Sequence, residues 1–225
     1  EIFRRLPITL HLGLTAFIIG SLIGIMLGIA SAIRRSSWID AFVTLLANLG
    51  IAAPPFWLAA LLIYLFGIHL KVLPVSGYTL PISDFWMSLR QSLMPILCLA
   101  VFPVASIARQ TRSSMLEVIC QDYIRTAWAK GLREGIIIIR HAVKNALIPV
   151  VTILGIILRY VVGGSVVIEI VFNIPGIGRL AVDSAVAQDY PVVQGIILLV
   201  AAIVVVINLA VDLFYGWLDP RIRYE

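Results

Sequence analysis

The sequence has little charge. Of 225 residues, 13% are charged and 61% are hydrophobic, and the mean hydropathy is +1.04. A soluble domain carries about a quarter charged residues and about half apolar ones. This composition excludes an ordinary soluble protein and predicts an integral membrane protein.

Sequence motifs for catalysis are missing as well. The chain has no G-x-x-x-x-G-K-[ST] loop to hold nucleotide phosphates, no H-E-x-x-H zinc site and no G-x-S-x-G nucleophile turn. His11, His69 and His141 stand too far apart in sequence to suggest a set of metal ligands. We therefore predict no catalytic residue, no metal site and no cofactor.

Polar residues inside the apolar runs are few. They are Asn48, Arg159, Glu169, Asn208 and Asp212. An enzyme within the membrane would need such residues in pairs on crossing helices, and these form no evident constellation. The net charge of +5 does not indicate nucleic acid, because the cations stand in loops rather than along one exposed face.

Only two cysteines are present, Cys98 and Cys120. On one continuous helix they would lie roughly 33 Å apart. That separation is far beyond the reach of a disulfide, so we expect two free thiols.

Five segments can cross a bilayer core of about 30 Å, which needs about 20 apolar residues each. They are residues 8–33, 39–66, 91–115, 146–168 and 192–214. Of the 17 lysines and arginines, eleven fall on the side that holds the long central loop and the C-terminus, and six on the other. The positive-inside bias predicts that this loop and the C-terminus are cytoplasmic. With five crossings and a cytoplasmic C-terminus, residue Glu1 would lie outside. We therefore expect a sixth helix upstream of Glu1.

Two of the predicted crossings carry unusual residues. The first has a ribbon of small residues, Ala16, Gly20, Gly24, Gly28 and Ala32, at four-residue spacing, which lets another helix approach closely. The second is interrupted by Pro54 and Pro55. Such a break is either a packing kink or part of the lining of a wet pathway, since only protein or water can satisfy the freed backbone groups.

Charge is concentrated between Leu116 and Pro149. Apolar residues recur at Leu116, Ile119, Cys120, Tyr123 and Ala127, which predicts an amphipathic helix. Gly131 after Lys130 indicates a helix stop, and a second short helix is expected to run to about Asn145. The segment is either a solvated loop that fixes topology or a rigid docking surface for a soluble partner.

A family resemblance favours the docking surface. The run Tyr-Ile-Arg-Thr-Ala-Trp-Ala-Lys-Gly-Leu at residues 123–132 resembles the cytoplasmic loop signature of binding-protein-dependent ABC importer permeases. The run Arg-His-Ala-Val-Lys-Asn-Ala-Leu-Ile-Pro at residues 140–149 resembles the version in the dipeptide, oligopeptide and nickel branch. Arg125-Thr126-Ala127 stands where the general signature has Glu-Ala-Ala. The ending Asp219-Pro220-Arg221-Ile222-Arg223 is similar to that branch too.

The resemblance implies an all-α, type I ABC importer permease fold, with residues 1–225 forming one permease domain and residues 116–145 forming the coupling loop. It also implies a second homologous permease subunit in the lipid membrane, two cytoplasmic ATPase subunits and an extracytoplasmic solute-binding protein. The residues that it assigns to ATPase coupling are Asp122, Tyr123, Arg125, Thr126, Ala127, Lys130, Gly131 and Leu132.

Residues 172–191 follow the fourth predicted crossing. Gly176, Gly178 and Ala181 match G-x-G-x-x-A, but no βαβ unit surrounds them, so we read the match as accidental. We expect instead a short external helix over residues 176–188, with Ile177, Leu180 and Ala181 facing other helices and Asp183 facing water.

Arg159 is expected ten residues past Pro149, about 15 Å into the membrane. It either lines the pathway, with Gly163 and Gly164 thinning the helix beside it, or extends its guanidinium to the outer headgroups. Asn48, Pro54 and Pro55 are the other candidate pathway residues.

The sequence thus predicts a permease subunit that carries short peptides and is not itself an enzyme. Nickel or another solute of the same branch is the alternative cargo. A membrane-embedded enzyme and a passive channel are the alternatives of another class.

Overall fold

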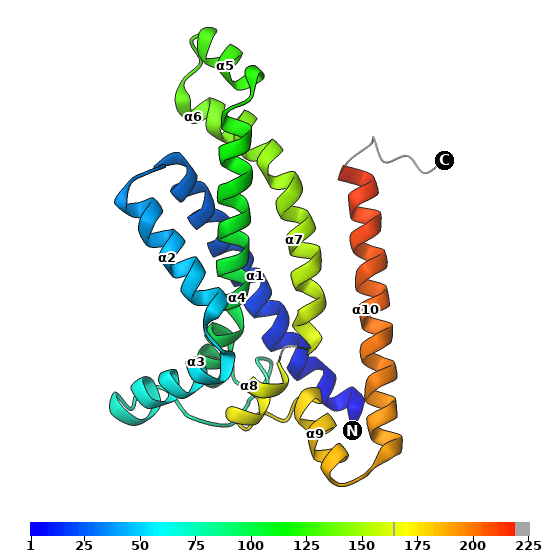
Figure 1. Cartoon of the computed structure of the whole chain (residues 1–225). Helices are drawn as coiled ribbons and strands as arrows, with labels where there is room; N and C mark the ends of the chain where they lie inside the picture. Colours follow the sequence, from blue (N-terminus) through cyan, green and yellow to red (C-terminus); the bar gives the residue numbers. More distant parts are fainter. Residues whose placement is uncertain (164, 219–225) are drawn as a thin grey trace. The chain divides into compact units, whose positions relative to one another are not determined.

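The computed structural model describes the backbone of residues 1–163 and 165–218, and the side chains of these residues except 160–163, 212 and 214–218. Gly164 and the C-terminal motif at residues 219–223 lie outside this part. The described residues form helices and no strand (Figure 1). Four helices are long and apolar enough to cross a membrane, or five if Trp38–Ala52 and Pro55–His69 form one broken span.

The helices follow one another along the chain, and the longest connection, residues 70–84, joins η1 to α4. In chain order they are α1 Ile2–Ile33, α2 Trp38–Ala52, α3 Pro55–Leu62, the π-helix η1 Ile63–His69, α4 Phe85–Ile119, α5 Asp122–Ala129, α6 Glu134–Ile136, the π-helix η2 Ile137–Val143, α7 Lys144–Gly163, α8 Val166–Val171, α9 Ile177–Val186 and α10 Tyr190–Leu218.

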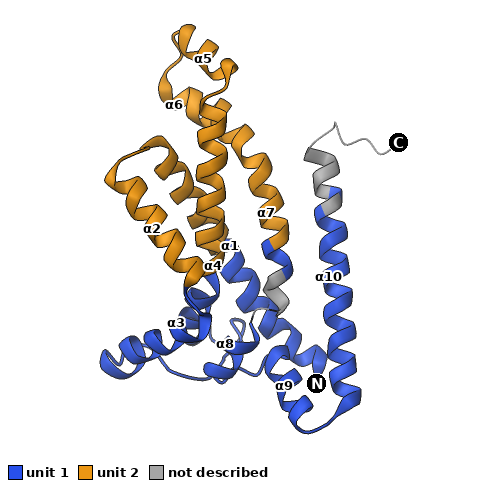
Figure 2. Ribbon diagram, in the orientation of Figure 1, with its two compact units in different colours: residues 1–18, 53–100, 157–225 blue, residues 19–52, 101–156 orange. Residues whose placement is uncertain are grey.

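The chain divides into two compact units, coloured separately in Figure 2. Unit 1 contains residues 1–18, 53–100 and 157–225, and unit 2 contains residues 19–52 and 101–156. Helices α1, α4 and α7 each contribute residues to both units.

Within unit 2, the small residues of α1 allow α4 to approach closely. A Cβ atom added to Gly24 would lie 2.9 Å from the Ile107 Cβ, and one added to Gly28 would lie 2.7 Å from the Ala108 carbonyl oxygen. Either atom would force the two helices apart. The predicted packing role of the small-residue ribbon is therefore confirmed at these two glycines.

The charged segment of unit 2 folds beyond the end of α4, where α5 and α6 are seen at one end of the ribbon (Figure 1). Its core is apolar and joins α5 and η2 to the ends of α1 and α4 and to the start of α7. The buried residues there are Ala32, Met115, Ile124, Ala127, Ile137, Ala142 and Ala146.

Within unit 1, two apolar clusters hold the helices together. The larger cluster joins α1, α3, α4 and α8, with Leu12, Met94, Ile168 and Phe172 at its centre. The smaller one packs Ile177 and Leu180 of α9 against Ile196 of α10 and the start of α1. The predicted helix after residue 172 is thus confirmed as α9, with Ile177, Leu180 and Ala181 against other helices and Asp183 exposed.

Two boundary predictions are wrong. The amphipathic helix expected from Leu116 through Ala127 is broken, because Gln121 takes extended backbone angles between α4 and α5. The fourth crossing does not begin at Ala146, since helical backbone runs on from Glu134 and encloses Pro149. Proline removes one backbone donor from the helix but does not end it here, as is common in membrane helices.

Candidate functional site

Helix α5 is the central element of the charged segment. Asp122 stands in its first turn, where a negative charge interacts favourably with the helix dipole. Ile124 and Ala127 are buried against the core of unit 2, and they anchor the helix. The other predicted coupling residues, namely Asp122, Tyr123, Arg125, Thr126, Lys130, Gly131 and Leu132, are all exposed.

A glycine ends α5 as predicted. Gly131 has φ of +74°, in the left-handed region that glycine occupies most easily. The Gly131 N–H donates to the Trp128 carbonyl at 2.9 Å, and the Leu132 N–H donates to the Ala127 carbonyl at 3.4 Å. This pair of bonds is the Schellman motif, which satisfies carbonyls at a helix end and turns the chain sharply.

The surface around α5 is suited to contact with another protein. Trp128 and Tyr123 are 45% and 43% exposed, although both are large aromatic residues. A cavity of about 220 Å³ is lined by Trp128, by apolar residues of α1, α4, α5 and η2, and by Arg35 and Glu134. Exposed aromatics, a shallow apolar hollow and a charged rim are typical of docking surfaces.

A hydrogen bond connects α5 to α7 within the same unit. The Asn145 amide donates to the Tyr123 hydroxyl at 3.0 Å and to the His141 carbonyl at 2.9 Å. The second bond holds the asparagine in place at the junction between η2 and α7. The two bonds therefore link α5 to the start of α7.

The second crossing is interrupted where the sequence predicts. Pro54 precedes α3 in an extended conformation and Pro55 is its first residue. Asn48 is exposed on α2 and lines a small pocket with Arg109 and Arg112 of α4. The structure thus brings Asn48 close to charged residues, and the pathway role of Asn48, Pro54 and Pro55 stays a prediction.

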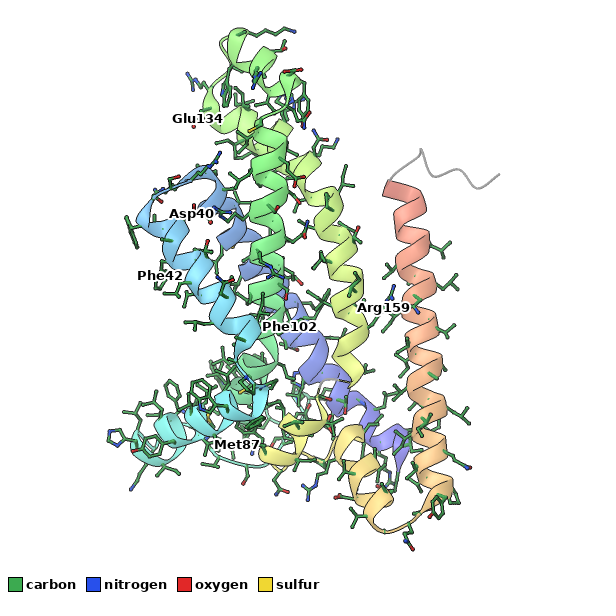
Figure 3. The ribbon with its side chains drawn as sticks, viewed as in Figure 1. Asp40, Phe42, Met87, Phe102, Glu134 and Arg159 are labelled. Atoms are coloured by element: carbon green, nitrogen blue, oxygen red, sulfur yellow. The ribbon has the colours of Figure 1, made fainter. Side chains whose placement is uncertain are left out.

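Arg159 is exposed near the end of α7, where Figure 3 labels it. Since the helix begins before Pro149, the starting point of the depth estimate is wrong, and the location of Arg159 across the membrane stays a prediction. Gly163 is the last residue of α7, and Gly164 lies outside the described residues.

Sequence reasoning missed a buried polar cluster in unit 1. The Glu169 side chain is fully buried in α8, and its Oε1 accepts hydrogen bonds from Thr9 Oγ1 at 2.7 Å and Ser165 Oγ at 2.8 Å. Its Oε2 accepts a hydrogen bond from the backbone N–H of Arg179 at 2.9 Å. The Thr9 hydroxyl in turn accepts a bond from the Ile177 N–H at 2.9 Å. Glu169 and Thr9 therefore satisfy two of the free donors at the start of α9.

This cluster explains the two glycines that match G-x-G-x-x-A. A side chain at Gly176 would overlap the Glu169 carboxylate, and a Cβ atom at Gly178 would lie 2.7 Å from the Val166 Cα. The glycines let α8 and α9 meet. The available signal was a lone glutamate in an apolar run, followed within ten residues by two glycines.

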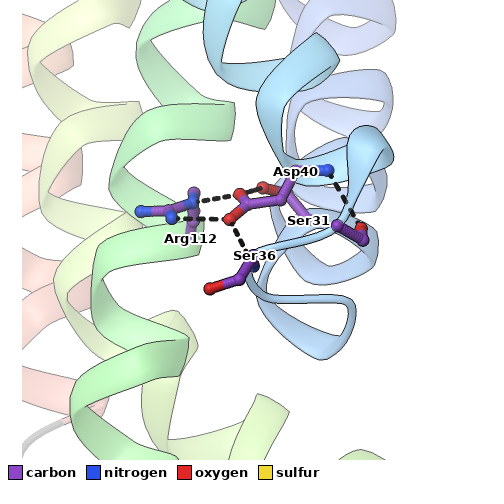
Figure 4. A network of polar contacts seen from close by, with 5 residues as sticks. Ser31, Ser36, Asp40 and Arg112 are labelled. Atoms are coloured by element: carbon purple, nitrogen blue, oxygen red, sulfur yellow. Dashed lines mark hydrogen bonds and ion pairs between the residues drawn. The ribbon is translucent and has the colours of Figure 1, made fainter.

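A second polar cluster lies in unit 2 (Figure 4). Arg112 donates to both carboxylate oxygens of Asp40, at 2.6 and 2.9 Å. Ser31 Oγ and the Ser36 N–H also donate to Asp40, at 2.6 and 3.0 Å. This bidentate pair ties α2 to α4 near the start of α2.

Tyr78 stands in the loop between η1 and α4, outside the membrane-length helices. Burial raises the pKa of Tyr78 to about 12, so its hydroxyl stays protonated at physiological pH. That hydroxyl forms a hydrogen bond with His11 Nδ1 at 2.9 Å and attaches the loop after η1 to α1.

Comparison with known proteins agrees with these features. Residues 24–224 match the family of binding-protein-dependent transport system inner membrane components. The dipeptide transport system permease protein DppB of Bacillus subtilis is 46% identical over 220 residues, covering 98% of this chain and 69% of that protein. The protein of the same name from Alkalihalophilus pseudofirmus is 41% identical over 244 residues, covering 100% and 73%.

A solved structure supports the fold. A chain from the MetNI methionine ABC transporter, in an inward-facing conformation, superposes with a TM-score of 0.76 at 20% identity, covering 97% of this chain and 96% of that one. The predicted helical fold of type I importer permeases is thus confirmed. The chain, with its membrane-length helices and its α5 segment, belongs to the family of inner membrane components of binding-protein-dependent transport systems.

Proposed function

We propose that this chain forms half of the membrane pathway of an ABC importer for short peptides. Its full-length similarity, at 41–46% identity, to proteins named as dipeptide permeases carries the proposal. The chain itself catalyses no reaction. A second homologous permease completes the pathway, two cytoplasmic ATPase subunits drive it, and an extracytoplasmic binding protein delivers the peptide.

The coupling element in this proposal is α5 with the residues that follow it. An ATPase subunit binds the exposed face around Arg125, Trp128 and Leu132. Closure of the two ATPase subunits moves α5 as a rigid body, because Ile124 and Ala127 fix it to the core of unit 2. The Tyr123–Asn145 hydrogen bond passes the movement to α7.

The transport cycle follows from a two-state equilibrium. Nucleotide binding favours one orientation of the pathway, and hydrolysis returns the other. A ligand shifts such an equilibrium only by binding the two states with different affinities. The orientation that we propose places α5 and the C-terminus in the cytoplasm and α9 outside, in agreement with the distribution of lysine and arginine.

Reconstitution of the complete assembly tests this function. The two permeases and the ATPase subunits are incorporated into vesicles, the binding protein is added outside, and uptake of a radiolabelled dipeptide is measured with and without internal ATP. We expect uptake that requires both ATP and the binding protein. Uptake by the isolated chain without ATP would indicate a channel, and uptake of nickel in preference to dipeptide would indicate the other cargo class.

A further inference from the structure

Polar side chains gather where α2 meets α4 in unit 2. The two helices are in close contact, since a Cβ atom added to Gly50 would lie 2.9 Å from the Ala105 Cβ. A pocket of about 50 Å³ opens at this contact, and its polar lining is Thr44, Asn48, Arg109 and Arg112. Thr44 and Asn48 are four residues apart on α2, so they share one face of that helix. Arg109 and Arg112 are three residues apart on α4 and do the same.

The pocket carries an excess positive charge. Two of the five N–H donors of Arg112 are used by Asp40, whose carboxylate neutralises that guanidinium. Arg109 is exposed and, among the described residues, has no ion pair with any carboxylate. Arg109 therefore supplies one positive charge that this chain does not balance.

The pocket lies between α4, which is long enough to cross a membrane, and α2, which is the first half of the broken span. Arg109 stands ten residues before the end of α4 and Asn48 ten residues after the start of α2. At the helical rise each distance is about 15 Å. Both residues fall within the predicted crossings 39–66 and 91–115, where an ionised side chain is expensive unless it faces water or an opposite charge, so an unbalanced Arg109 indicates a binding function.

We propose that Arg109, assisted by Asn48 and Thr44, binds the C-terminal carboxylate of a peptide on its way through the membrane. This inference rests on the proposed peptide-import function. A guanidinium offers a carboxylate two parallel N–H donors, and the asparagine amide and threonine hydroxyl offer further ones. A volume of about 50 Å³ admits a few water-sized groups, which suits a carboxylate but not a whole residue.

The site binds a group that every unmodified peptide carries, whatever its side chains. It would therefore hold peptides of many sequences with similar strength. Its exposed position at the side of the helix contact also leaves the rest of the peptide outside the pocket. A phospholipid phosphate has the same charge and similar acceptors, so the experiment must separate the two sources.

The test measures import of Ala-Ala and of its C-terminal amide by the reconstituted assembly. For each variant, the rate for Ala-Ala is divided by the rate for the amide. This ratio is then divided by the same ratio for the unaltered assembly, which cancels any preference of the binding protein. We expect Arg109→Gln to lower the ratio about tenfold, the usual effect of losing a hydrogen bond to a charged group. Arg109→Lys should keep most of the ratio, because it retains the charge. Arg90→Gln, an exposed arginine nearer the other end of α4, is the matched control and should leave the ratio unchanged.

Three results would overturn the inference alone. They are equal loss of both substrates in Arg109→Gln, no loss of either, and an effect that appears only in vesicles containing an anionic phospholipid. The last result would assign the pocket to a lipid phosphate. If the unaltered assembly imported neither peptide, the proposed function would fail and this inference with it.

Discussion

The Tyr123 hydroxyl accepts a hydrogen bond from the Asn145 amide at 3.0 Å, which joins α5 to the start of α7. These residues are 22 positions apart in sequence. Both are exposed, so the bond contributes little to stability, and in the proposed mechanism its role is to transmit movement from α5 to α7.

We expect Tyr123→Phe to loosen the coupling between hydrolysis and transport. The variant keeps the ring but loses the bond, worth about 1 kcal/mol. The number of peptides imported per ATP hydrolysed should fall by a few-fold, while assembly stays normal. Tyr190→Phe, which alters an exposed tyrosine at the start of α10, is the control. An unchanged ratio in Tyr123→Phe would show that α5 does not act through this bond.

Gly131→Trp is expected to uncouple hydrolysis from transport without preventing insertion. The added Cβ meets open space, so the damage comes from forcing a non-glycine residue to φ of +74° and from the bulk on the docking face. The conformational strain alone is about 1–3 kcal/mol. Gly135→Trp adds the same bulk nearby in equally open space without a left-handed backbone, and should couple normally. Normal transport by Gly131→Trp would contradict the lever mechanism.

Glu169→Gln should destabilise unit 1. The amide puts N–H groups against donors that now serve the carboxylate, and at least one charge-assisted bond of about 2 kcal/mol is lost. We expect the thermal midpoint of the purified assembly to fall by on the order of 5 °C. Glu117→Gln, which changes an exposed carboxylate on α4, should not move it. A midpoint unchanged in both variants would mean that the Glu169 cluster does not hold α9 in place.

The sequence was sufficient to predict elements whose signal is local. Apolar length predicts the membrane helices, Gly131 predicts the end of α5, and the small residues predict where α1 packs. The start of the fourth crossing could not be predicted, because Pro149 looks like a boundary when neighbouring helices are unknown.

Sites built from distant segments escaped prediction for a physical reason. Thr9 and Glu169 are separated by 160 residues, and no periodicity links them. Asn48 was recognised only as a polar residue in an apolar run, since its place in one pocket with Arg109 and Arg112 depends on how α2 packs on α4. Both clusters are formed by contacts between distant segments, so they can be recognised only when the tertiary structure is known.

Arg159→Gln should insert normally and lower import of anionic peptides more than that of cationic ones. The reason is that Arg159 is exposed and is predicted to face the pathway. Rates for Asp-Ala and Lys-Ala measured in the same vesicles give the comparison. Equal loss of both rates would contradict the pathway role. It would favour the alternative, in which the Arg159 guanidinium reaches the outer headgroups.

Site-directed cross-linking tests the central claim most directly, because it asks which partner each end of the chain meets. In the complete assembly with Cys98 and Cys120 replaced by serine, a single cysteine is placed at Arg125 on α5 or at Val186 on α9, which is 81% exposed. We predict that Arg125→Cys cross-links to an ATPase subunit and Val186→Cys to the binding protein. Cross-links from Arg125→Cys to the binding protein, or from Val186→Cys to an ATPase subunit, would contradict the proposed orientation and the role of α5.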